Sequence, residues 1–213
     1  MRSNNSQILV AEYQLDDIGP GAVGWATGNS KYAQGGITVR IACVLDVDYE
    51  DSEFKQPFDA FSNQGHQVTI VGLQSGKELW GKQGKVTTKA DLGIDQARPE
   101  QFDALFIPGG YSPDHLRADP RMVKFTKTFF DADKPVLAIC HGPQLLMTAR
   151  VVKGRKMTAW ITIQDDLSQV GTNVLDQEVV VDKNLVTSRQ PSDIPAFIRE
   201  STKVLEKVPV GAR

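Results

Sequence analysis

The chain has 213 residues, of which 40% are hydrophobic and 23% charged, and its formal net charge is -2. These values are typical of one globular domain with a substantial core, and the mixed charges argue against a dedicated nucleic-acid surface. No apolar run approaches the ~20 residues that cross a bilayer, and the first segment has only a short apolar patch at residues 8–11. We therefore expect a cytoplasmic protein with no membrane partner.

Two regions differ in composition. Residues 1–37 are rich in Gly, Asn and Ser without any period, which predicts an irregular N-terminal extension. In residues 38–213 apolar strands alternate with amphipathic helices. This alternation predicts one α/β domain with a mainly parallel sheet and helices on both faces.

The domain is predicted to begin with a buried strand. Residues 39–45 form a continuous apolar run of the kind found in parallel sheets, and Cys43 within it is expected to be a core residue. Phenylalanines at helical spacing predict a helix over 52–65, and residues 66–73 predict the second strand. The alternating, glycine-containing segment 76–92 predicts a hairpin or edge strands.

The middle of the domain repeats the strand–helix alternation. A short helix over 97–103 is predicted to lead into a strand at 104–108. A helix over 119–134 follows, with apolar residues on one face. Residues 135–139 are predicted to form another buried strand, and 142–149 another helix.

The last part of the chain predicts two helices around a hairpin. Residues 162–171 are predicted to be helical, and the segments 178–182 and 184–188 to form a β-hairpin. A long amphipathic helix over 191–208 closes the domain.

Three loops that leave predicted strands carry chemically unusual residues. They read DVDYEDSEF (46–54), PGGYSPDHL (108–116) and AICHGP (138–143). Ligands of open α/β sheets bind outside the carboxyl ends of the strands. We therefore expect the acidic residues, the diglycine and the cysteine to share one edge of the sheet.

The third loop has the pattern small-x-Cys-x-Gly, the thiol analogue of the G-x-S-x-G nucleophile elbow. A tight strand-to-helix turn would place Cys140 at a helix N-terminus, where the dipole favours the thiolate and lowers the pKa. The alternative is a buried cysteine that merely ends a core strand. The adjacent His141 and the abrupt change from strand to helix favour the nucleophile.

A nucleophilic cysteine needs a base, and two histidines are candidates. His141 is its neighbour in sequence, and its ring can approach the sulfur if the elbow turns sharply. His115 is the alternative base, or else an ordinary loop residue. The residues alone leave this choice open.

Two further features suit such a site. Gly109 and Gly110 allow a close backbone approach, and a free N–H there would form an oxyanion hole with the N–H that follows Cys140, although Pro-Gly-Gly is also a common turn. Glu53 is either a favourable carboxylate at a helix N-terminus or a carboxyl aimed at Cys140. If it is buried there, it would be protonated and could donate a hydrogen bond to the thiolate.

These segments together resemble the PfpI family of intracellular cysteine proteases and their stress-protein relatives, within the superfamily of class I glutamine amidotransferases. The resemblance covers residues 39–208 and includes YEDSEF, FDALFIPGGYSPDHLR, KPVLAICHGPQLL and EVVVDKNLVTSRQPSD. It implies a flavodoxin-like three-layer α/β sandwich. The N-terminal extension is not typical of the family.

The resemblance also implies roles for individual residues. Cys140 matches the nucleophile, with His141 beside it, and Glu53 matches the carboxyl that hydrogen-bonds the sulfur. Gly110 and the amide of His141 match the oxyanion-hole donors. Asp114 matches an acid that completes the triad of an adjacent subunit, which implies a homo-oligomer.

One further position matches the family near its pocket. Trp160 falls where relatives often place an aromatic residue, and its alternative interpretation is simply a core residue.

The expected function is a cysteine-dependent enzyme of carbonyl stress, a glutathione-independent glyoxalase or a deglycase, with a small carbonyl compound as substrate. A peptidase acting on small peptides is the first alternative, and a non-enzymatic redox sensor or chaperone-like stress protein is the second. No motif in the sequence suggests a metal ion or an organic cofactor.

Overall fold

A seven-stranded sheet forms the centre of residues 38–209, the part of the chain that the computed structural model describes. The strands in order across the sheet are β10 (Val179–Asp182), β11 (Leu185–Ser188), β7 (Val136–Ile139), β6 (Ala104–Ile107), β1 (Arg40–Val44), β2 (Gln67–Gly72) and β5 (Leu92–Gly93). Neighbouring strands run parallel except β10 and β11, which form the predicted antiparallel hairpin. The extension predicted for residues 1–37 lies outside the described residues.

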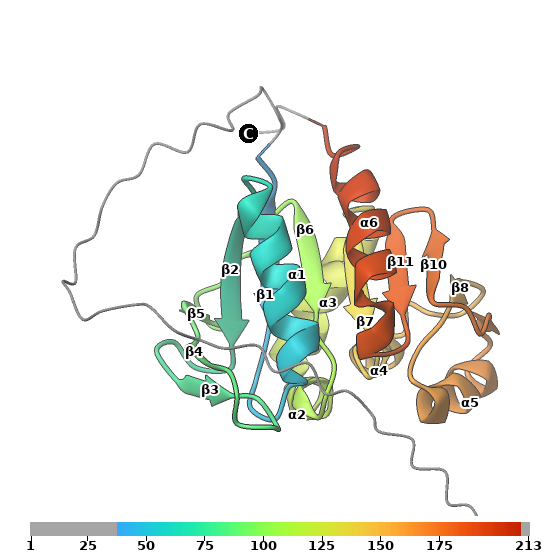
Figure 1. Ribbon diagram of the computed structural model, residues 1–213, viewed down its shortest axis with the longest axis horizontal. Helices are drawn as coiled ribbons and strands as arrows, with labels where there is room; N and C mark the ends of the chain where they lie inside the picture. Colours follow the sequence, from blue (N-terminus) through green and yellow to red (C-terminus); the bar gives the residue numbers. More distant parts are fainter. Residues whose placement is uncertain (1–37, 210–213) are drawn as a thin grey trace, which may run out of the picture. The chain divides into compact units, whose positions relative to one another are not determined.

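The helices cover both faces of this sheet. In Figure 1, α1 (Asp51–Asn63) and α6 (Ile194–Leu205) lie in front of it, and α3 (Pro120–Asp131) and α4 (Pro143–Thr148) lie behind it. The strands β2-β1-β6-β7-β11 lie side by side in the flavodoxin-like order. The predicted three-layer α/β sandwich is therefore confirmed. Among the described residues, no helix combines the length and apolar character needed to span a membrane.

Alternate side chains of the central strand enter the two cores. Ile41 and Cys43 of β1 pack in the cluster that contains residues of α1 and α6, whereas Ala42 and Val44 pack in the cluster formed with α3 and α4. Because both faces are covered, every second position does not need to be polar, which explains the continuous apolar run. Cys43 is a fully buried core residue, as predicted, and burial raises the pKa of its thiol.

Several smaller elements refine the predictions. A hairpin of β3 (Glu78–Trp80) and β4 (Thr87–Lys89) and the helix α5 (Ile161–Gln169) are confirmed. The helix predicted over 97–103 is only a 3-10 turn, η1 (Pro99–Gln101), and another such turn, η2 (Pro191–Asp193), precedes α6. The short strands β8 (Lys156–Met157) and β9 (Asn173–Val174) were not predicted. The loop expected at 108–116 contains a helix, α2 (Ser112–Arg117).

Candidate active site

Cys140 occupies a tight turn between β7 and α4. Its φ is 62°, in the left-handed region that costs a residue with a side chain roughly 1–2 kcal/mol. A Cβ on Gly142 would lie 2.7 Å from the carbonyl oxygen of Ile107, so only glycine fits where the chain folds back. The elbow predicted for this segment is present in the backbone.

The thiol of Cys140 lies next to one histidine ring. Its Sγ is 3.3 Å from Nδ1 of His141, and 7% of the residue is exposed to solvent. The predicted approach of the neighbouring imidazole to the sulfur therefore occurs.

Glu53, in the first turn of α1, brings a carboxyl group to the same place. The residue is fully buried, and neither carboxyl oxygen has a hydrogen-bond partner of normal geometry within residues 38–209. A Cβ on Gly109 would collide with Oε2 of Glu53 and lie 2.6 Å from Cβ of Cys140. The missing side chain of Gly109 is what allows the carboxyl and the cysteine to meet.

Burial raises the pKa of Glu53 to about 8, and the nearby thiol of Cys140 opposes this rise. Glu53 is therefore mainly protonated at neutral pH. A protonated carboxyl without another acceptor can donate its hydrogen to a thiolate, which agrees with the prediction for a buried Glu53.

The pKa of Cys140 does not follow the expectation from the helix N-terminus. Burial raises it, followed by the negative charge of an ionised Glu53, whereas the backbone N–H groups of Gly110 and His141 lower it. The expected lowering of the Cys140 pKa is thus wrong, because burial, the largest cause, outweighs the two amides and the dipole of the six-residue helix α4. Protonation of Glu53 removes the repulsion by its charge, but the larger effect of burial remains, so the two amides offset only part of the cost of forming the thiolate.

The imidazole of His141 is neutral at neutral pH. Burial and the positive charge of Lys82 lower its pKa, and the charge of Asp114 raises it by less. The rings of Trp160 and Tyr111 flank it, with centroids at 6.4 and 6.3 Å. A neutral imidazole between aromatic rings can accept the thiol proton through Nδ1.

Comparison with known proteins agrees with this geometry. The model of the DJ-1/PfpI family matches residues 39–204. The chain belongs to the DJ-1/PfpI family. The resemblance identified from the sequence is confirmed.

Two bacterial relatives match this chain over nearly their own whole length. General stress protein 18 of Bacillus subtilis is 52% identical over 169 residues, which cover 79% of this chain and 98% of that protein. Protein/nucleic acid deglycase 2 of Escherichia coli is 50% identical over 167 residues, which cover 78% of this chain and 97% of that protein.

Solved structures share the family fold. A two-domain protein of Anabaena variabilis with DJ-1/ThiJ/PfpI-like and ferritin-like domains superposes with a TM-score of 0.77 at 34% identity, over 79% of this chain and 48% of that one. DJ-1beta of Drosophila melanogaster has a TM-score of 0.74 at 23% identity, over 80% of this chain and 92% of that one. The flavodoxin-like fold of the family is therefore shown for this chain.

The remaining predicted residues of the DJ-1/PfpI site lie on α2, not in a loop. Asp114 is 56% exposed and pairs with Arg117 of the same helix at 3.1 Å. His115 is half-buried on α2. Within the described chain, the histidine in contact with the sulfur is His141, so the geometry favours it over His115 as the base.

A charged pair beside the cysteine was missed at the sequence level. Lys82, in the loop between β3 and β4, pairs with the buried carboxylate of Glu50 at 2.7 Å, and Gln83 bonds the other oxygen of Glu50 at 2.7 Å. The charge of Lys82 acts on Glu53 and lowers its pKa. The acidic Glu50 just before α1 could have marked a charged site in the sequence. Nothing in the sequence, however, indicates that it pairs with Lys82, 32 positions later.

Gly109→Ala is expected to lower thiol reactivity strongly and the free energy of unfolding by roughly 1–3 kcal/mol, because the added methyl has no room between Glu53 and Cys140. Urea denaturation and iodoacetamide alkylation measure the two effects. Gly154→Ala is the control for the site: its methyl would meet nothing within 4 Å, so its positive φ of 76° should cost roughly 1–2 kcal/mol of stability and leave the alkylation of Cys140 at the wild-type rate. Wild-type reactivity in the Gly109 variant would contradict the close packing of the site.

Proposed function

We propose that this protein is a stress-response enzyme that uses Cys140 to attack reactive carbonyl compounds, as a glutathione-independent glyoxalase or a deglycase. The observation that carries the proposal is the placement of one sulfur, 3.3 Å from the Nδ1 of neutral His141 and against the buried carboxyl of Glu53. The names of the two bacterial relatives, a general stress protein and a deglycase, support it. We place the enzyme in the cytoplasm, where reducing conditions keep a catalytic thiol free.

The first chemical step is attack of the thiolate on an aldehyde. His141 accepts the thiol proton, and the sulfur of Cys140 forms a bond to C1 of methylglyoxal. The aldehyde oxygen takes the negative charge, which the N–H groups of Gly110 and His141 are placed to stabilise. Protonation of this oxygen gives a hemithioacetal.

The second step moves a proton along the bound substrate. The hydrogen on C1 leaves as a proton and a proton is added at C2, while the hydroxyl proton on C1 passes to the oxygen of C2, so that C1 becomes a thioester carbonyl and C2 a carbinol carbon. His141, or a relay through Glu53, carries these protons. Water then cleaves the carbon–sulfur bond, which releases lactate and restores the thiol without an external oxidant.

The same thiol and imidazole support a peptidase as the second candidate. Cys140 would form an acyl-enzyme with a small peptide, and the exposed ring of Tyr111 beside His141 would contact its apolar side chains. A third function, redox sensing, would use oxidation of Cys140 without turnover.

A substrate panel separates these functions. Purified protein is incubated with methylglyoxal, with glycated amino acids and with a fluorogenic peptide, and protein alkylated by iodoacetamide serves as the blank. Lactate or released free amine supports the proposal, and peptide cleavage alone replaces it with the peptidase. Failure of all three, with stoichiometric oxidation of Cys140 at low peroxide, supports the sensor and overturns the enzyme.

We further propose that the site is completed in a homo-oligomer by Asp114 of a neighbouring subunit. Its 56% exposed carboxylate is available to a partner, and Arg117 orients it. Asp114→Ala is expected to weaken turnover, and mixing it with Cys140→Ala subunits should restore part of it, because a mixed interface can contain one complete site. Lack of complementation in oligomers shown to be mixed would contradict the shared site.

A further inference from the structure

The backbone of Cys140 is held from both sides by segments distant in sequence. Its N–H donates to the carbonyl oxygen of Ser188 at 3.0 Å, and its own carbonyl oxygen accepts the N–H of Trp160 at 3.0 Å. A residue in the left-handed region persists only where its surroundings over-determine it. The relative placement of these two segments therefore sets the position of the sulfur.

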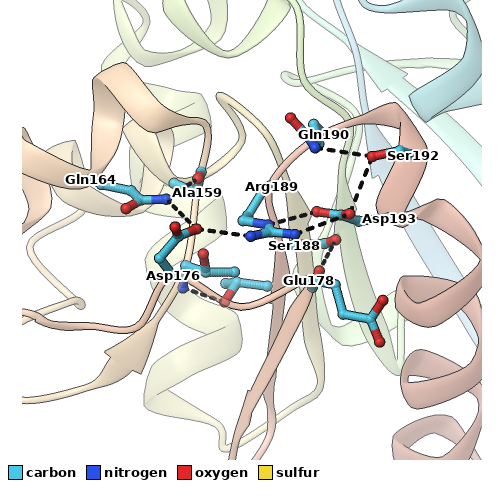
Figure 2. A network of polar contacts seen from close by, with 11 residues as sticks. Ala159, Gln164, Asp176, Glu178, Ser188, Arg189, Gln190, Ser192 and Asp193 are labelled. Atoms are coloured by element: carbon cyan, nitrogen blue, oxygen red, sulfur yellow. Dashed lines mark hydrogen bonds and ion pairs between the residues drawn. The ribbon is translucent and has the colours of Figure 1, made fainter.

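A network of side chains joins the same two segments (Figure 2). Arg189, which directly follows the acceptor of the Cys140 N–H, donates from Nη1 to Oδ1 of Asp176 at 2.9 Å. Gln164 contacts the same oxygen at 3.4 Å and donates to the carbonyl oxygen of Ala159 at 3.0 Å. Ala159 precedes the donor to the Cys140 carbonyl, so the network closes a ring around the elbow.

Arg189 also forms an ion pair with a residue at the start of helix α6. Its Nε donates to Oδ2 of Asp193 at 2.8 Å, and the side chain of Asp193 is almost fully buried at the start of that helix. A planar guanidinium can hold two carboxylates in fixed directions, which an ammonium cannot do. Since both carboxylates already pair with Arg189, its charge is not free to bind an anionic substrate.

We infer that Arg189 is a positioning residue that fixes the Cys140 elbow by tying the segment after β11 to the segment before α5. The inference rests on the proposed role of Cys140 as the reactive thiol. Without Arg189 the two segments can separate, and the sulfur moves away from the N–H groups of Gly110 and His141. The thiolate is then less stable and reacts more slowly at neutral pH.

The test measures alkylation of Cys140 by iodoacetamide as a function of pH. Cys43 is fully buried, and Cys140→Ser provides the blank. Arg189→Ala is expected to lower the rate at pH 7 about tenfold, which corresponds to a rise of the thiol pKa by about one unit. The midpoint of the pH profile should move upward accordingly.

Arg155→Ala is the matched control. Arg155 donates to the carboxylate and carbonyl of Asp182 and to Asn184, and the side chains of the ion pair are each 18% exposed. These contacts of Arg155 lie at the end of β10 that is far from the Cys140 elbow. Asp182 pairs with the first residue of β11, which lies next to the start of β7, whereas Cys140 follows the end of β7. Its loss should cost stability, measured by urea denaturation, and leave the alkylation profile at the wild-type position.

An unchanged or faster rate in Arg189→Ala, or an equal fall in Arg155→Ala, would overturn the inference. If Arg189→Ala does not fold, Asp176→Asn is the deciding variant, because it weakens only the contacts from Arg189 through residue 176 to Gln164. Its alkylation rate should fall roughly threefold, which is the size expected from one charged hydrogen bond of a partly exposed group. Alkylation needs no substrate. Failure of the wild type to convert methylglyoxal would thus overturn the proposed function while the effect of Arg189 remains measurable.

Discussion

Replacing Cys140 by serine is expected to reduce carbonyl turnover by roughly a thousandfold or more, as for loss of a nucleophile that acts as a unit with its base. A hydroxyl is a far weaker acid than a thiol, so neutral His141 and the two amides cannot ionise it to a useful extent. Serine is nearly isosteric with cysteine, so it fits the elbow without a change of shape. The free energy of unfolding should therefore change by less than about 1.5 kcal/mol, and lactate release together with urea denaturation measures both effects.

Cys43→Ala is the control for this variant. It also removes a thiol, but from the core between β1 and the helices α1 and α6, where it should cost roughly 1 kcal/mol of stability and leave turnover intact. Turnover near the wild-type rate in Cys140→Ser would exclude the thiolate mechanism. Loss of turnover in both variants would instead indicate a general dependence on the fold.

Replacing Glu53 by glutamine is expected to change how stability depends on pH. The pKa of Glu53 is about 8 in the folded protein, above its ordinary value of 4.5. A raised pKa contributes stability that is fully present below about pH 4.5 and is lost as the pH rises through 8. Glutamine cannot ionise, so the free energy of unfolding of Glu53→Gln, relative to that of the wild type, should rise by about 3–5 kcal/mol between pH 4.5 and pH 9.

The measurement is urea denaturation of both proteins at several pH values. Glu100→Gln is the control, because Glu100 is an exposed residue of η1, and its pH dependence should match that of the wild type. Turnover of Glu53→Gln separates the two proton routes, since an amide can donate a hydrogen bond but cannot pass a proton: lost turnover indicates the relay through Glu53, and retained turnover indicates His141. Parallel pH profiles of wild type and Glu53→Gln would show that this carboxyl is ionised in the folded protein, against the burial argument.

The sequence alone determined the architecture and most of the site. Continuous apolar runs and helical spacing are local properties, and they predicted the buried strands, the hairpin of β10 and β11 and the covering helices. The three loops after predicted strands predicted that Glu53, Gly109 and Cys140 meet, because carboxyl ends of parallel strands share one edge. The elbow was predictable because a small-x-Cys-x-Gly pattern fits only a narrow range of backbone turns.

The tertiary structure decided what depends on distance and burial. The isolation of the Glu53 carboxyl, the raised pKa of Cys140 and the pairing of Lys82 with Glu50 follow from desolvation and from contacts between segments far apart in the chain. The ring through Arg189 is of the same kind, since Ala159 and Gln164 lie at the start of α5, Asp176 before β10 and Arg189 after β11. A linear pattern records which side chains are present, but the free energy of a charge depends on what surrounds it in space, and only the folded chain fixes that.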